Sequence, residues 1–149
     1  MLDIIIIICC VLGGFAIGKY IENRINEKGK FFQDATRYTA ALKENVNGRQ
    51  LELAKFNAEF CKSSSKAFGE YLVSGKIRMR LSKAQKDALT ALFANLNCAS
   101  SQELIQHLDY YGRLICDEAK NIQDKEVAKS SIYSKLGMLL GAMLGILLV

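Results

Sequence analysis

Two uncharged apolar runs, one near each end of the chain, constrain the fold more than any other feature. The first is IIIIICCVLGGFAIG, residues 4–18, and the second is LGMLLGAMLGILLV, residues 136–149. As helices, the first run with Leu2 and the second with Ile132 and Tyr133 each span most of a hydrocarbon core of about 30 Å. A chain of 149 residues is too small to bury two helices that are apolar on every face. We therefore predict transmembrane helices at residues 1–19 and 132–149.

Each apolar run has a tyrosine and a lysine at its inner end. Lys19 and Tyr20 follow the first run, while Tyr133 and Lys135 precede the second. Aromatic rings at the headgroup level, and lysines that reach the headgroups along their own stems, are typical of membrane boundaries. These four residues are therefore predicted to lie at the membrane interface, in contact with membrane lipids.

The alternative for the first run is a signal peptide cleaved near Gly14-Phe15-Ala16, which would leave an exported helical protein. Such a peptide needs a positive region before its apolar core. No Lys or Arg precedes this run, and Asp3 occupies that place. The sequence therefore favours a retained span.

The distribution of cations predicts the orientation of the chain. All twenty Lys and Arg lie between Lys19 and Lys135. By the positive-inside rule, the middle of the chain, residues 20–131, faces the cytoplasm. Its three cysteines are then expected to be reduced thiols: Cys61, Cys98 and Cys116.

The middle of the chain is predicted to be a small helical bundle, so the fold class is all-α. Proline is absent, and strand-like alternation is not sustained. Apolar residues at helical spacing lead from Ile21 to a turn at Asn47-Gly48. A second helix follows over residues 51–60, and the serines at 63–65 break it. A third helix, residues 66–73, is expected to end at Gly75.

Two capping boxes mark the later helix starts. Ser82 with Gln85 begins one helix, and the Ser100-Ser101-Gln102-Glu103 stretch begins the next. From there an apolar stripe runs from Leu104 to Ile122. This last helix is predicted to continue into the second span without a break, unless it bends near Ser130-Ser131.

The sequence offers few groups for catalysis or metal binding. The chain has one histidine, His107, which is expected at the surface or boundary of the core because neighbouring Gln106 and Asp109 project elsewhere. No CxxC, HExxH, GxSxG or phosphate-binding glycine loop is present. We therefore expect no catalytic residue, no cofactor and no metal site, and a protein that is not an enzyme.

Five cations without a carboxylate lie within residues 76–86. They are Lys76, Arg78, Arg80, Lys83 and Lys86. Such a stretch is a candidate surface for an acidic partner or anionic headgroups, and the alternative is an ordinary loop that enters a helix. Nucleic acid is disfavoured because no aromatic residues are interleaved with the cations.

Glycines repeat at every fourth position in both apolar runs. Gly137, Gly141 and Gly145 share one face of the second helix, and Gly14 and Gly18 have the same spacing in the first. Faces of this kind allow close backbone approach. The two runs are predicted to pair within one chain, and pairing between chains in a homo-oligomer is the alternative.

Several stretches resemble stage III sporulation protein AB of endospore-forming bacteria. SSQELIQHL at residues 100–108 is similar to that family's final helix start, and IYSKLGMLLGAMLGILLV is similar to its closing span. IGKYIENRINEK, residues 17–28, is similar to its exit from the first span.

The resemblance implies a platform or adaptor in the mother-cell membrane, within the secretion-like apparatus that links mother cell and forespore. Its soluble domain would be similar to inner-membrane platform domains of type II secretion and type IV pilus machines. The implied partners are a cytoplasmic secretion ATPase and other subunits of the envelope complex. The alternative is a membrane-tethered helical regulator or binding module.

Overall fold

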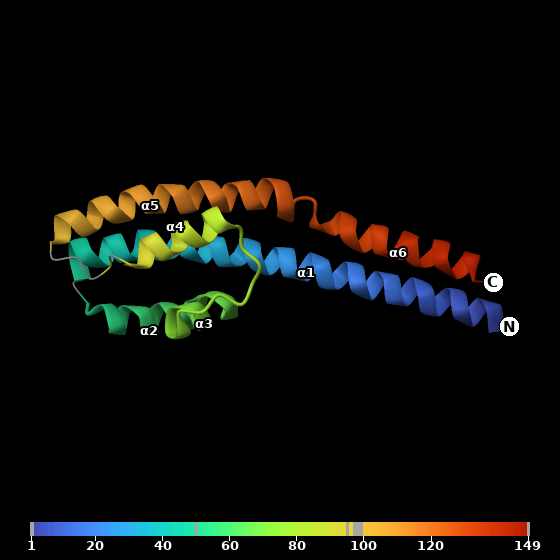
Figure 1. Cartoon of the computed structure of the whole chain (residues 1–149). Helices are drawn as coiled ribbons and strands as arrows, with labels where there is room; N and C mark the ends of the chain where they lie inside the picture. The colour runs from blue at the N-terminus through green and yellow to red at the C-terminus, as the bar shows by residue number, and fades with distance from the viewer. Residues whose placement is uncertain (1, 50, 95, 97–99, 149) are drawn as a thin grey trace. The chain divides into compact units, whose positions relative to one another are not determined.

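The computed structural model describes residues 2–49, 51–94, 96 and 100–148, and all regular elements in this part of the chain are helices (Figure 1). The predicted all-α fold class is therefore confirmed. The predicted loop residues 97–99, with Cys98, lie outside the described residues. The α-helices are α1 (Leu2–Glu44), α2 (Leu53–Ser63), α3 (Lys66–Ser74), α4 (Lys83–Ala94), α5 (Ser101–Ile122) and α6 (Ser130–Leu147), and the π-helical segments are η1 (Asn45–Arg49) and η2 (Gln123–Val127).

The chain divides into two compact units. One unit combines Met1–Gly29 with Ile122–Val149, and the other is Lys30–Asn121. We call them the paired-helix unit and the helical unit. The boundaries predicted at residues 19 and 132 fall inside the paired-helix unit, because its two helices stay together for about ten residues beyond each apolar run.

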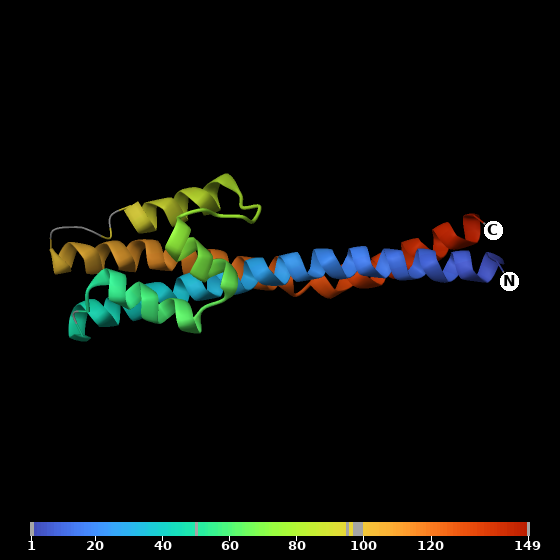
Figure 2. The ribbon, with the colours of Figure 1, turned by 90° about the horizontal axis from the view of Figure 1, so that it is seen from below.

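The paired-helix unit contains the first part of α1, η2 and the whole of α6, and in it α1 and α6 lie side by side and antiparallel. Both ends of the chain meet at the same end of this pair (Figures 1 and 2). Large apolar side chains cover its outside: Ile5 is 60% exposed, Leu12 61% and Leu139 62%. Exposed apolar surface of this extent is typical of a surface that contacts a membrane or another protein.

The core of the helical unit is built mainly of aromatic rings. Tyr38 of α1 is fully buried, and its ring centroid lies 5.3 Å from Phe60, 5.8 Å from Phe68 and 5.4 Å from Phe93. Most of the rings meet at steep angles, which suits the quadrupoles of aromatic pairs. Helices α2, α3 and α4 are thereby joined to α1 around one side chain that the apolar pattern did not single out.

Helix α5 packs antiparallel against the last part of α1. Lys43 Nζ pairs with Asp109 Oδ1 at 2.6 Å, and Gly112 lies against the Thr39 side chain. The predicted stripe on α5 is confirmed, because Leu108 and Ile115 are buried on this side.

The predicted helix boundaries at the serines and at Gly75 are confirmed. Helix α2 ends at Ser63 and α3 begins after Ser65. Gly75 ends α3 with a φ of 67° and donates its N–H to Tyr71 O at 2.8 Å. A left-handed residue at this position is most easily a glycine.

The first predicted capping box is present in full. Ser82 N donates to Gln85 Oε1 at 3.0 Å, and Gln85 N donates to Ser82 Oγ at 3.2 Å. At the second box Glu103 N donates to Ser100 Oγ at 3.2 Å, which makes Ser100 the cap of α5. Both start signals therefore act through the backbone N–H groups that they were expected to satisfy.

Both long helices pass into π-helical segments near their predicted ends. The last helix is not continuous into the second span, because α5 ends at Ile122, η2 follows, and α6 begins only at Ser130. Since η2 is itself helical, the break is the turn at residues 128–129, and the bend predicted near Ser130-Ser131 is confirmed to within two residues. The π-helical η1 continues α1 to Arg49, so the helix end predicted at Asn47-Gly48 is also confirmed. Just after it, Leu51 O accepts a hydrogen bond from the Asn45 side chain at 3.0 Å, and Leu51 N donates one to that side chain at 3.1 Å.

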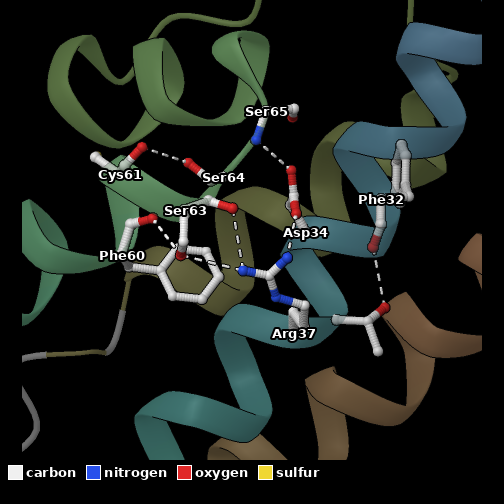
Figure 3. A network of polar contacts seen from close by, with 9 residues as sticks. Phe32, Asp34, Arg37, Phe60, Cys61, Ser63, Ser64 and Ser65 are labelled. Carbon is white, nitrogen blue, oxygen red and sulfur yellow. Dashed lines mark hydrogen bonds and ion pairs between the residues drawn. The ribbon is translucent and has the colours of Figure 1, made fainter.

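A buried carboxylate joins α1 to the junction between α2 and α3 (Figure 3). Asp34 Oδ2 accepts a hydrogen bond from Ser65 N at 2.6 Å, and Oδ1 lies 3.5 Å from the Arg37 guanidinium. Arg37 also donates to Ser63 O at 3.2 Å and lies over the Phe60 ring. The Asp34 carboxylate therefore accepts the Ser65 N–H, which has no partner within α3, and the dipole of α3 favours a negative charge at this end of the helix.

Candidate functional site: paired apolar helices and a basic surface

The five predicted glycines lie at the contact between α1 and α6. A Cβ atom added at Gly14 would collide with the backbone of Gly137, and one added at Gly18 would collide with that of Tyr133. Added Cβ atoms would likewise meet the Cys10 backbone at Gly141 and Ile7 Cα, at 3.0 Å, at Gly145. All five positions thus support close approach of the two helices within one chain. Pairing between chains stays a prediction.

The four residues predicted at the membrane interface lie at the same height along the two helices, next to the glycine contact. Because Gly18 meets the backbone of Tyr133 and Ser134, the Lys19-Tyr20 pair lies beside the turn that holds Tyr133 and Lys135. All four side chains are exposed. A tyrosine and a lysine on each helix at one level is the arrangement expected where a helix pair leaves the hydrocarbon core.

Polar neighbours of the two junction residues lie on α1. Lys19 Nζ pairs with Glu22 at 2.9 Å, and the Tyr20 hydroxyl accepts hydrogen bonds from Arg24 at 2.7 and 3.0 Å. These contacts lie within the first two turns after the apolar run, where polar side chains take the place of apolar ones on α1.

A second set of contacts joins the helices farther along the pair, and sequence reasoning missed it. Lys28 Nζ lies 2.8 and 3.0 Å from the two carboxylate oxygens of Glu126. Ser130 Oγ donates to Val127 O at 2.7 Å and lies 3.2 Å from Asn26 Oδ1. Gly29 leaves space that the Val127 side chain fills. These residues are about one hundred positions apart, so no local pattern could have shown them.

Two helical stretches of the described chain are long and apolar enough to cross a membrane. They are Ile4–Gly48 and Ser101–Leu147, and their most apolar windows are only 6% and 17% buried. A core helix of a soluble protein would be mostly buried, so these values favour the lipid-facing interpretation.

The five predicted cations of the basic stretch are all exposed on the helical unit. Lys76, Arg78 and Arg80 lie in the irregular segment between α3 and α4, whereas Lys83 and Lys86 lie in the first turn of α4. Arg78 is 3.5 Å from Glu70. The stretch is therefore a solvated surface whose charge is little neutralised.

His107 links two helices through its ring. Nε2 donates to Leu92 O at 3.1 Å, and the ring centroid lies 4.6 Å from that of Tyr111. The half-buried ring thus satisfies a carbonyl near the end of α4. This is the boundary position that was predicted. Within the described residues, no group of three or more His, Cys, Asp and Glu side chains is arranged to hold a metal ion.

These features define an all-α protein with two candidate membrane-spanning helices, packed as an antiparallel pair, and a separate helical unit. The sequence model of the family "Stage III sporulation protein AB" matches residues 36–149, so the chain belongs to this family and is related to sporulation. The resemblance predicted from the sequence is thereby confirmed. Neither the search of curated proteins nor that of solved structures gave a match.

Proposed function

We propose that the chain is a non-enzymatic membrane platform, or adaptor subunit, of a secretion-like channel complex between mother cell and forespore. In this role the paired helices anchor the protein in the mother-cell membrane. The helical unit faces the cytoplasm, where it docks a secretion-type ATPase and contacts other subunits of the envelope complex.

The observation that carries this proposal is the separation of an apolar anchor from a charged helical unit within a sporulation-family chain. The outer face of the anchor is apolar, with Leu12 61% and Ile17 65% exposed. The helical unit instead displays cations at Lys76, Arg80 and Lys86. A protein that assembles others needs an anchor and a contact surface, and an apolar helix pair and an exposed basic stretch are suited to these two tasks.

The proposed orientation rests on charge near the junctions. Lys19, Arg24 and Lys28 follow the first apolar run, and Lys129 and Lys135 precede the second. Lysine and arginine close to span ends are retained on the cytoplasmic side.

Affinity capture of the full chain from sporulating cells tests the proposal. The tagged protein, extracted in mild detergent, should recover a cytoplasmic ATPase and envelope subunits, and an untagged strain processed in parallel is the control. Recovery of neither class of protein would contradict the platform role and favour a tethered regulator.

A further inference from the structure

The helical unit carries an open hollow beside the basic stretch. Its volume is about 450 Å³, and α2, α3 and the segment after α3 form its walls. Cys61, Gly69 and Val73 supply apolar lining, while Lys66 and Arg78 lie at its rim with Glu70. The hollow was not predicted, because two helices and a loop have to meet to form it.

Val73 is the most unusual residue of this hollow. This residue is 84% exposed, the highest value among the large apolar residues described in the helical unit. Gly69, one turn earlier on α3, has no side chain to cover it. A valine presented to water beside a concave apolar surface is suited to contact with an apolar side chain of another molecule.

The net charge of the chain is concentrated in residues 66–86, the stretch that includes Lys66, Glu70 and Arg78 of the hollow. The whole sequence has twenty basic and fifteen acidic residues. Residues 66–86 hold six of the basic residues and one of the acidic residues, so the rest of the chain is balanced at fourteen of each. The entire formal excess of five positive charges therefore belongs to one surface stretch.

We propose that this hollow and the cations that follow it in the sequence bind an acidic segment of a protein partner. An apolar side chain of that segment enters the hollow against Val73, and its carboxylates pair with Arg80, Lys83 and Lys86. The inference rests on the proposed function, since the partner belongs to the complex that the platform would assemble. The inference adds to the proposed function the surface at which the partner binds and the acidic character of the segment that binds there.

A protein segment fits these observations better than anionic lipid. Membrane-surface binding typically uses an amphipathic helix with cations along its polar face and large apolar residues opposite. Here three of the five cations lie in irregular chain, and the apolar residue stands beside a hollow rather than on a flat face. Charge complementarity would then guide the acidic segment, while the hollow provides selectivity.

Photo-crosslinking identifies what touches the hollow. A photoreactive amino acid at Val73 of the full chain, in sporulating cells, should form a protein adduct whose crosslinked peptide is rich in Asp and Glu. Position 110 is the matched control, because Tyr110 is also exposed on the helical unit, on α5. A lipid adduct, a peptide without acidic excess, or an equal yield of the same adduct from position 110 would overturn the inference.

Two variants test the contributing forces separately. Val73→Ser should weaken partner capture about tenfold, the effect of losing one buried valine side chain. The double variant Arg80→Glu with Lys83→Glu should weaken it further at low salt and less at high salt. Lys55→Glu with Lys120→Glu changes the net charge equally at exposed positions elsewhere on the helical unit, and should leave capture unchanged.

The same captures separate this inference from the proposed function. If the unaltered chain and all variants recover the same envelope subunits equally, the docking surface is wrong and the platform role stands. If the unaltered chain recovers no subunit, both fall, because no partner remains for the surface to bind.

Discussion

At the scale of single residues, Asp34 links the start of α3 to α1. Its side chain is 11% exposed, and its carboxylate accepts the Ser65 N–H at 2.6 Å. Asp34→Ala leaves that donor without its partner at the helix start, which we expect to destabilise the helical unit by about 1–3 kcal/mol. Urea unfolding of the full chain in detergent, followed by circular dichroism, measures the loss. Asp87→Ala, at an exposed position on α4, is the control, and equal losses would contradict the role of Asp34.

Tyr38 makes the stability of the helical unit sensitive to alkaline pH. Burial, with a smaller contribution from Cys61, raises the pKa of its phenol well above the usual value. The unfolded chain ionises this phenol near pH 10, so the protonated folded form loses stability as the pH rises above that value.

Tyr38→Phe should therefore reduce the fall in stability between about pH 9 and about pH 11. At neutral pH the variant also loses the 2.8 Å hydrogen bond to Asn57, at a cost of about 1 kcal/mol. Urea midpoints across this range, for both proteins, check the prediction. Parallel pH profiles would show that the phenol contributes nothing to alkaline unfolding.

At the scale of elements, the glycine contact predicts a sharp difference between neighbouring positions of one helix pair. Gly141→Leu should separate α1 from α6, because even a Cβ at this position collides with the Cys10 backbone. Gly13→Leu should not, since nothing lies within 4 Å of a Cβ there. Both variants remain apolar and should stay in the membrane fraction.

Spin labels at positions 20 and 132 of the full chain in nanodiscs report the separation. The distance distribution should lengthen or broaden for Gly141→Leu and remain as in the unaltered protein for Gly13→Leu. Unchanged distances in both variants would remove the packing role of Gly141.

Elements whose signals are local were predictable from the sequence. The Ser82 and Gln85 box, the serine break and the Gly75 end each depend on residues within four positions of one another. The central place of Tyr38 and the contact between Lys28 and Glu126 were not predictable. Tyr38 meets rings from three other helices, and Lys28 and Glu126 lie 98 positions apart in the sequence.

The candidate site likewise has parts that were predictable from the sequence and parts that were not. The glycine faces and the exposed cations follow from spacing and composition, and the structure places them as expected. A glycine face alone fits pairing within or between chains, so the partner helix could not be inferred. The hollow at Val73 was invisible because its walls come from separate elements.

At the scale of the whole molecule, the charge distribution predicts which side of the membrane the helical unit occupies. Cys61 and Cys116 are partly exposed free thiols of this unit. On intact cells an impermeant thiol reagent should label them poorly, and labelling should rise after permeabilisation. Asp3→Cys, on the predicted outer side, is the positive control. Equal labelling of Cys61 and Cys116 before and after permeabilisation would contradict a cytoplasmic location.

The glycine spacing also limits how the two paired helices slide along each other. Backbone contact requires a glycine on one side, and on α6 these occur only at Gly137, Gly141 and Gly145. A slip of one to three residues would bring leucine, methionine or alanine side chains into the contact. The next permitted register is four residues away, about 6 Å along the axis. Sliding of α1 along α6 is thus restricted to steps of four residues. A force along the axis of either helix is therefore transmitted to the other.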